Sequence, residues 1–152
     1  HLFDSFEGLP PASIRDGVNA LEQQKGGKLW FDGNTANYEQ FLRDLEQFKP
    51  DSVDVFVHKG WFNETLNNYP LYGKISVLRL DGDWYDSTMV CFKLLWKKVV
   101  AGGLVLIDDY YDWPGCANAV HKFLAEKFEE NSDFYCPLRS TKYGLAYLVK
   151  PS

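Results

Sequence analysis

Four carboxylates that follow two apolar runs are the residues of this chain best suited to chemistry. The stretch "VLRLDGDWYDSTM" (77–89) places Asp81 and Asp83 after one run, and "LVLIDDYYDW" (104–113) places Asp108 and Asp109 after another. Carboxylate oxygens are preferred ligands of Mg²⁺, and positioned carboxylates also act as general acids and bases. Which of these uses applies depends on the elements that deliver the four side chains.

The order of apolar patterns predicts an α/β fold in a single domain over residues 1–152. Strands are expected to end at Asp4 and to cover 53–57, 75–80 and 104–107, and helices are expected over 36–48, 86–100 and 116–129. A loop is expected over 7–17, and a closing antiparallel pair over 133–140 and 143–150. Alternating strands and helices predict right-handed crossovers and a doubly wound, mostly parallel sheet.

Local features of these elements are also expected from the pattern. Alternation predicts that Val53, Val55 and Val57 share one face of a strand. The helix over 86–100 has N-cap candidates in its first residues, 86–88, and the Gly102–Gly103 pair as its stop. The unbroken run "LVLI" predicts burial on both sheet faces. Five residues of the last helix are expected to point inward, namely Ala117, Val120, Phe123, Leu124 and Phe128.

The expected fold brings the acidic residues to one edge of the sheet. Asp4, the Gly60–Trp61 pair and both acidic pairs each follow the carboxyl end of a parallel strand, and ligands bind at that edge in such folds. Carboxylates gathered there repel one another. Basic neighbours, a shared proton or a hard cation would relieve the repulsion, and Arg79 is one of the few bases nearby. Alternatively, the acids cap the helices that follow them.

Composition excludes several classes of protein. A net charge of −5 and a pI near 5.1 argue against nucleic-acid binding, and no apolar run reaches the ~20 residues of a membrane span. The first residues, "HLFDSFEGLPP", do not resemble a signal peptide. Cys91, Cys116 and Cys136 lack metal-site spacing and are expected to be free thiols, which indicates a cytoplasmic protein.

Other candidate residues are less specific. Trp61 and Phe62 follow a strand end, where they either wall a ligand cleft or cover the sheet edge. His121 is expected on the helix after Asp109, and His58 just before the "KGWF" loop. The chain has no nucleophile elbow, no phosphate-binding P-loop and no G-x-G-x-x-G motif.

Four blocks of the sequence together resemble the macrocin O-methyltransferase family. These blocks are "FDSFEGLP", "KGWFNETL", "LRLDGDWYDST" and "GGLVLIDDYYDWPGCANAVHKF", and they extend from residue 3 to residue 123. The resemblance implies a Rossmann-like class I methyltransferase fold. It is to the C-terminal two-thirds of that domain, so we expect the first strand and its glycine-rich turn to be lacking.

The resemblance also implies an activity and a set of roles. The implied reaction transfers a methyl group from S-adenosylmethionine to a hydroxyl of a sugar or another small molecule, with a divalent cation, usually Mg²⁺. Asp81, Asp108 and Asp109 would bind the cation, and Asp81 would also be the general base. The cofactor would meet Asp4 and Ser5 at its ribose and Gly60, Trp61 and Phe62 at its adenine. Asp83 and His121 are secondary candidates.

Two other functions stay open from the sequence. A non-catalytic, methyltransferase-like fragment would associate through its incomplete sheet, and a homo-oligomer is one form of such association. A different Mg²⁺ enzyme on a doubly wound sheet, such as a phosphohydrolase, would also place paired acids at strand ends. The block "FDSFEGLP" has no role in the phosphohydrolase interpretation.

Overall fold

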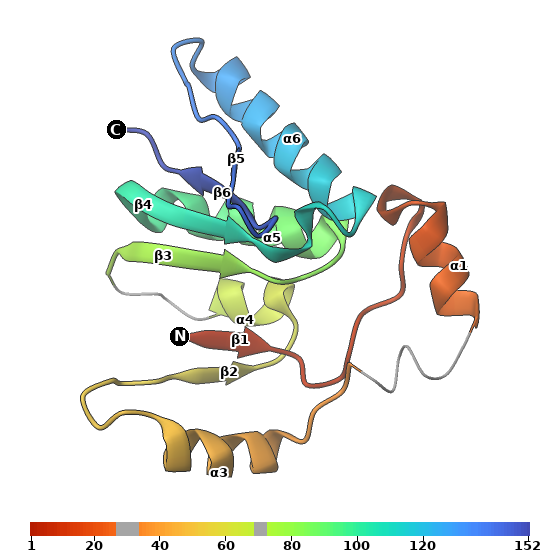
Figure 1. Cartoon of the computed structure of the whole chain (residues 1–152), viewed down its shortest axis with the longest axis vertical. Helices are drawn as coiled ribbons and strands as arrows, with labels where there is room; N and C mark the ends of the chain where they lie inside the picture. The colour runs from red at the N-terminus through yellow and green to blue at the C-terminus, as the bar shows by residue number, and fades with distance from the viewer. Residues whose placement is uncertain (27–33, 69–72) are drawn as a thin grey trace.

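The computed structural model describes residues 1–26, 34–68 and 73–152. Its strands and helices alternate along most of the chain, as an α/β protein requires (Figure 1). The strands are β1 (Leu2–Asp4), β2 (Val57–Lys59), β3 (Ile75–Leu80), β4 (Val99–Ile107), β5 (Arg139–Ser140) and β6 (Ala146–Val149). The helices are α1 (Val18–Gly26), α3 (Tyr38–Phe48), α4 (Phe62–Asn68), α5 (Tyr85–Leu95) and α6 (Pro114–Glu130), with short 3₁₀ turns η1 (Ile14–Asp16), η2 (Trp96–Lys98) and η3 (Asp108–Tyr110).

The strands form two separate hydrogen-bonded sheets. β1 pairs with β2 in parallel, while β3, β4, β6 and β5 form a mixed sheet in that order. β1 lies beside β3 in space, but the two strands are not paired, and a cavity of about 770 Å³ is lined by residues of both (Figure 1). The α/β class and the parallel register are therefore confirmed, with a break between β1 and β3.

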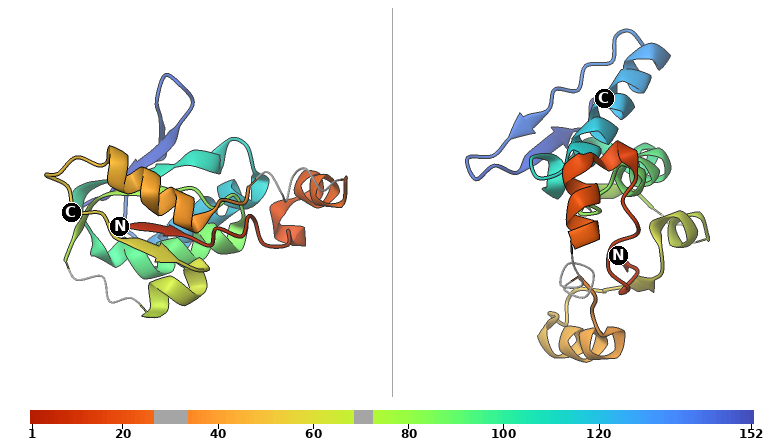
Figure 2. Two further views of the ribbon diagram at one scale, coloured as in Figure 1. Left: turned by 90° about the horizontal axis from the view of Figure 1, so that it is seen from below. Right: turned by 90° about the vertical axis from the view of Figure 1, so that its right-hand side faces the viewer.

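The hydrophobic core lies between the four-stranded sheet and helices α5 and α6 (Figure 2). Val105 and Ile107 of β4 are fully buried against this layer, as are Phe92 of α5 and Phe123 of α6, whose rings stack at 4.4 Å. Leu104, on the other face of β4, is 37% exposed. The expectation that "LVLI" is buried on both faces was wrong, because α5 and α6 cover the same face.

Several expected elements are confirmed with shifted ends. The helix over 36–48 begins at Tyr38, because the Asn37 side chain accepts a hydrogen bond from the Gln40 amide and caps it. The closing strands pair in antiparallel fashion, although the first is only two residues long. The strand expected over 53–57 was misplaced: the chain enters β2 only at Val57, where pairing with Leu2 begins.

The helix over 86–100 was predicted too long. α5 ends at Leu95, and Val99 already pairs with Ile75 as the first residue of β4. Gly102 has a φ of 76° and lies where the register between β3 and β4 shifts, so the glycine pair marks an irregularity inside the strand and not a helix stop. The N-cap is Trp84, without a side-chain cap bond, and not one of residues 86–88.

Sequence reasoning also missed α1 and misplaced one aromatic residue. α1 follows the loop region and buries only Ala20, so its sequence carries a weak apolar pattern. On α6, Phe123 is buried as expected, but Phe128 is 54% exposed near the end of the helix.

Cys91, Cys116 and Cys136 are buried free thiols, which confirms the expectation for them. Within the described ranges, no helix has both the length and the hydropathy needed to cross a membrane.

Phe123 and Phe128 give a matched test of this packing on one helix. Phe123→Ala removes a buried ring and is expected to lower the free energy of unfolding by about 3–5 kcal/mol. Phe128→Ala is expected to change it by less than about 0.5 kcal/mol, because the ring is mainly in water. Urea denaturation followed by circular dichroism measures both. Equal losses in the two variants would show that the two rings are equally buried, and would contradict the exposed position of Phe128.

Candidate functional site

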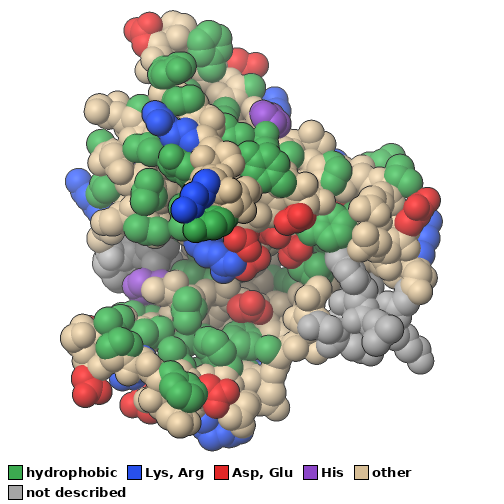
Figure 3. Space-filling model, in the orientation of Figure 1, with side chains coloured by type: hydrophobic (Ala, Val, Ile, Leu, Met, Phe, Trp, Pro, Cys, Tyr) green, Lys and Arg blue, Asp and Glu red, His purple; other side chains and the backbone are tan. Residues whose placement is uncertain are grey.

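The acidic residues meet where β3 and β4 end. The two strands are parallel, and Leu80 pairs with Ile107, so Asp81 and Asp108 begin adjacent loops at the same edge. Figure 3 shows acidic side chains gathered around a hollow in the middle of this face, with basic side chains beside them. The expected convergence at the carboxyl edge of the sheet is therefore confirmed.

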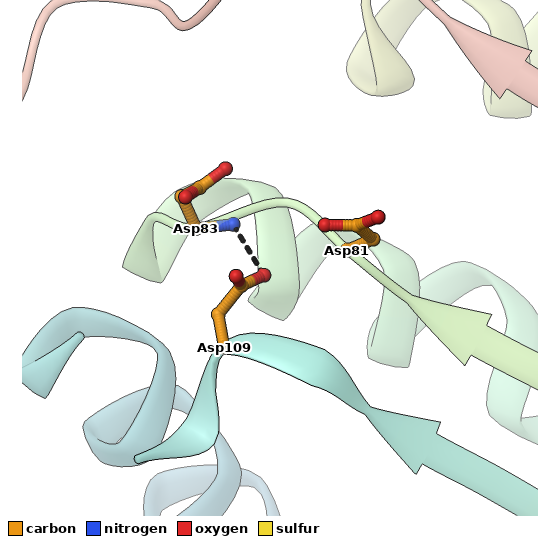
Figure 4. Close-up of side chains that lie close together, drawn as sticks. All are labelled: Asp81, Asp83 and Asp109. Carbon is orange, nitrogen blue, oxygen red and sulfur yellow. Dashed lines mark hydrogen bonds between the residues drawn. The ribbon is translucent and has the colours of Figure 1, made fainter. Parts of the chain in front are cut away.

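Three of the four carboxylates form a compact cluster. One oxygen each from Asp81, Asp83 and Asp109 lies within 4.8 Å of the other two (Figure 4). Asp108, which the family resemblance placed among the metal ligands, lies outside this set. The geometry groups Asp83 with Asp81 and Asp109 in its place.

Arg79 accounts for the different position of Asp108. Its guanidinium lies 2.8 Å from an Asp81 oxygen and 2.7 Å from an Asp108 oxygen, so it bridges the ends of both strands. All three side chains are substantially exposed, and ion pairs of this kind contribute little to stability. A basic neighbour thus relieves part of the repulsion, which was one of the three solutions open from the sequence.

Asp109 organises the loop that carries Asp81 and Asp83. Its side chain is buried, and one oxygen accepts hydrogen bonds from the Gly82 amide at 3.1 Å and the Asp83 amide at 3.0 Å. Asp83 adopts a φ of 54°, which is uncommon for a residue other than glycine. The helix-capping interpretation of the acids is wrong here, because α5 begins without a side-chain cap bond and Asp109 binds the amides of the preceding loop.

The pKa values of Asp83 and Asp109 are raised, mainly by burial and also by neighbouring negative charges. Burial, followed by the charge of Asp109, raises the pKa of Asp83 to about 7, against a lowering effect from a hydrogen bond with Trp113. Burial is also the main cause that raises the pKa of Asp109, and its bonds from the Asp83 and Gly82 amides oppose the rise. These carboxylates are therefore costly to ionise together, and added positive charge would favour their ionised forms.

A cavity of about 590 Å³ adjoins the cluster. Its wall includes all five residues expected to meet the cofactor, which are Asp4, Ser5, Gly60, Trp61 and Phe62, and it also includes Asp81. Asp81 thus belongs both to the acidic cluster and to the cavity wall. This volume is typical of small-molecule sites.

Turns after β1 and β2 shape one side of the cavity. An Asp4 oxygen accepts a hydrogen bond from the Phe6 amide at 2.6 Å, and the Ser5 hydroxyl donates to the Gly8 carbonyl at 3.2 Å. The Gly60 amide donates to the Asp4 carbonyl at 2.8 Å and continues the β1–β2 ladder. Gly60 has a φ of 140°, and a Cβ there would lie 2.9 Å from the Thr65 methyl group, so this turn requires glycine.

The two candidate histidines, His58 and His121, lie outside the acidic cluster. The His121 ring is exposed on α6, and its Nε2 lies 2.9 Å from the Tyr110 hydroxyl. The His58 ring stacks on Phe3 at 4.3 Å. Among the described residues, the group of side chains close enough to share a metal ion consists of three aspartates and includes neither histidine.

Several wall residues were missed by sequence reasoning. α5 contributes Asp86, Val90 and Lys93, which follow one another at helical spacing, and the loop after β1 contributes Leu9 and Pro10. The spacing of three and four residues along α5 was a usable signal, since it places these side chains on one face. The contribution of the loop depends on its tertiary contacts and had no such signal.

Comparison with solved structures first defines the class of fold. The structure of the O-methyltransferase NovP matches 99% of this chain and 59% of its own, with a TM-score of 0.77 and 29% identity. The calicheamicin methyltransferase CalS11 shares the fold, with a TM-score of 0.66 and 23% identity over 97% of this chain. The fold is thus one found in methyltransferases.

The chain belongs to the macrocin-O-methyltransferase (TylF) family, whose profile matches residues 1–132. A relative in Streptomyces niveus, demethyldecarbamoylnovobiocin O-methyltransferase, is 32% identical over 81% of this chain and 46% of its own length. Another, 8-demethyl-8-(2,3-dimethoxy-alpha-L-rhamnosyl)-tetracenomycin-C 4'-O-methyltransferase of Streptomyces olivaceus, is 35% identical over 79% of this chain and 44% of its own. The chain therefore spans about half the length of these relatives.

The raised pKa of Asp83 predicts how stability depends on pH in the absence of metal ions. Below about pH 4 the folded and unfolded chains both hold this proton, and its stabilising effect is fully present. As the pH rises toward about 7 the unfolded chain releases the proton first, so the free energy of unfolding falls. Asp83→Asn cannot ionise and does not suffer this loss. Its melting temperature relative to the wild type is therefore expected to rise as the pH increases from about 5 to about 8.

Calorimetry in a chelating buffer measures this difference. Asp112→Asn is the matched control, because Asp112 is an exposed acid of the following turn, outside the cluster. Its difference from the wild type should not grow with pH. If the difference in melting temperature between Asp83→Asn and the wild type stayed constant with pH, the pKa of Asp83 would not be raised in the folded chain.

Proposed function

We propose that this chain contributes the cation site and much of the cofactor site of an S-adenosylmethionine-dependent O-methyltransferase that acts on a sugar hydroxyl. One observation carries the proposal: Asp81 is shared by the acidic cluster and by a cavity that contains all five expected cofactor residues. Family membership supports the reaction class. The rhamnosyl group in the name of one relative supports a sugar acceptor.

The clustered donors fit a hard divalent cation. Asp81, Asp83 and Asp109 offer only oxygen ligands, which suit Mg²⁺, and the raised pKa values of Asp83 and Asp109 indicate a place where positive charge is favoured. Asp108 is a further ligand in this proposal if it exchanges its exposed ion pair with Arg79. When bound, the cation would orient the acceptor hydroxyl and lower its pKa.

The cavity has side chains suited to the methyl donor. Trp61 and Phe62 offer aromatic surface for a flat adenine ring, and the Asp4 carboxylate can accept hydrogen bonds from ribose hydroxyls. The Ser5 and Gly60 contacts hold the turn that presents Asp4. The roles of Asp4, Trp61 and Phe62 follow those that the family resemblance implies. Ser5 and Gly60, which the resemblance also placed at the cofactor, line the cavity and have the further role of holding the turn.

Asp81 is the proposed proton acceptor because it alone of the three clustered carboxylates also lines the cavity. Asp81 would take the proton of the acceptor hydroxyl. The acceptor oxygen would displace the methyl group from the sulfonium in a single step, in which the carbon–oxygen bond forms as the carbon–sulfur bond breaks and its electron pair stays on sulfur as a neutral thioether. Asp81 must first exchange its ion pair with Arg79, which costs little because both side chains are about half exposed.

Binding measurements on two variants separate the two halves of this site. Asp81→Asn is expected to weaken Mn²⁺ binding by about ten-fold or more, as losses around metal sites commonly do. Trp61→Ala is expected to weaken S-adenosylmethionine binding and to leave Mn²⁺ affinity unchanged. Paramagnetic resonance measures Mn²⁺ binding, and calorimetry measures cofactor binding. Asp112→Asn, the charge-matched control, should change neither, and a folded wild type that binds neither probe contradicts the proposal for this chain.

The gap in the sheet favours a second candidate function, in which the chain associates through a strand. β1 and β3 both face the 770 Å³ cavity without being paired to each other, and Val77 of β3 is 58% exposed. Unpaired strand edges accept strands from other chains, including a second copy. This candidate requires neither cation nor cofactor.

Light scattering across a range of protein concentrations tests association through the gap. The wild type is expected to form dimers, and Val77→Lys is expected to prevent them by placing a charge on the exposed edge strand. Tyr143→Lys introduces the same charged residue at an 85% exposed side chain in the β5–β6 turn and should leave dimers intact. A wild type that stays monomeric throughout would exclude this candidate.

A further inference from the structure

A buried carboxylate outside the acidic cluster has a specific set of partners. Asp16, the last residue of η1, is only 2% exposed. One of its oxygens accepts hydrogen bonds from the Ser13 amide at 2.7 Å and the Ser13 hydroxyl at 2.8 Å. The other accepts from the Tyr85 amide at 2.7 Å. These donors are neutral, so hydrogen bonds have to offset the loss of water around the charge.

The bond to Tyr85 replaces a missing helix cap. Tyr85 is the first residue of α5, and its amide has no partner within the helix. Trp84, at the N-cap position, makes no side-chain cap bond. Asp16 therefore caps α5 from 69 residues away in the sequence.

Asp16 also lies against the first turn of α6. A Cβ on Gly115 would lie 2.5 Å from an Asp16 oxygen and 2.8 Å from its Cα, so only glycine leaves room for it. The carboxylate thus faces the amino-terminal ends of two helices, where negative charge is favourable. Both helices follow the acidic loops, α5 after Asp83 and α6 after Asp109.

The same segment forms part of the cavity wall. The Trp84 indole N–H donates to the Pro10 carbonyl at 2.9 Å, and Pro10 lines the cavity together with Gly8 and Leu9. The Gly82 and Asp83 amides are held by Asp109, and the Tyr85 amide is held by Asp16. Hydrogen bonds to two carboxylates therefore fix the loop that carries Asp81 and Asp83.

We infer that Asp16 is a positioning residue, which fixes the acidic loop at 81–84 and ties the cavity wall at 8–10 to it. It belongs neither to the acidic cluster nor to the cavity lining, so we infer that it acts through the Tyr85 amide and the backbone of α5. Its effect on cation affinity rests on the proposed function. Its effect on the conformation of the loop does not.

Variants at Asp16 and its neighbours distinguish positioning from a local structural role. Asp16→Ala removes the acceptor for the Tyr85 amide, and Asp16→Asn retains one acceptor oxygen. Ser13→Ala removes the hydroxyl bond inside η1 and leaves the bond to Tyr85. Arg15→Ala breaks the exposed Arg15–Asp86 ion pair, which joins the same two segments. Ser13→Ala and Arg15→Ala are therefore matched controls.

Amide hydrogen exchange and Mn²⁺ affinity are the two measurements. Asp16→Ala is expected to speed exchange of the amides at 82–85 by about ten-fold or more and to weaken Mn²⁺ binding by about 10- to 100-fold, as loss of residues that support metal ligands commonly does. Asp16→Asn should lie between Asp16→Ala and the wild type. The two controls should stay within about three-fold of the wild type on both measurements.

Each outcome decides whether Asp16 positions the acidic loop or only stabilises its own turn, η1. Equal effects in Asp16→Ala and Ser13→Ala, or faster exchange throughout the chain instead of at 82–85, would overturn the inference. If Asp16→Ala does not fold, the comparison of Asp16→Asn with Ser13→Ala decides in the same way. A wild type that binds no Mn²⁺ would remove the proposed cation site, while exchange at 82–85 would still decide the role of Asp16.

Discussion

Repulsion between carboxylates at the ends of β3 and β4 is the constraint around which this part of the molecule is built. Parallel pairing in register brings the acids of both loops to one edge, and the chain then has to stabilise them. Arg79 neutralises part of the charge at Asp81 and Asp108, and two backbone amides donate hydrogen bonds to Asp109. The turn at Asp83, with its positive φ, points the loop amides at Asp109.

The position of the cavity follows from the same edge. Residues of the turns after β1 and β2 line one cavity together with Asp81, which follows β3 across the break in the sheet. In the proposed function, a cation site and a cofactor site that share Asp81 would hold the acceptor oxygen close to the methyl carbon, which displacement at carbon requires. The chain spans about half the length of the two Streptomyces relatives that it matches.

The strand ends were predictable from the sequence because each apolar run stops abruptly at an acid, and parallel strands end at a common edge. The place of Asp83 in the cluster was not, since it depends on one backbone angle in a loop. Periodicity placed α3 correctly, but it extended α5 to residue 100 because a glycine pair inside a strand resembles a helix stop. The contact between Asp16 and Tyr85 joins distant segments, and no local pattern indicates it. The cytoplasmic location and the residue roles stay predictions.

The fit between Asp16 and Gly115 has a consequence for the divergence of related sequences. A methyl group at position 115 would lie 2.5 Å from the Asp16 carboxylate, 2.8 Å from the Asp16 Cα and 3.1 Å from the Tyr85 amide nitrogen, and the last two atoms belong to the backbone. A smaller side chain at position 16 would therefore remove only one of the three conflicts. Related sequences that keep this packing should thus retain glycine at position 115 whichever residue occupies position 16.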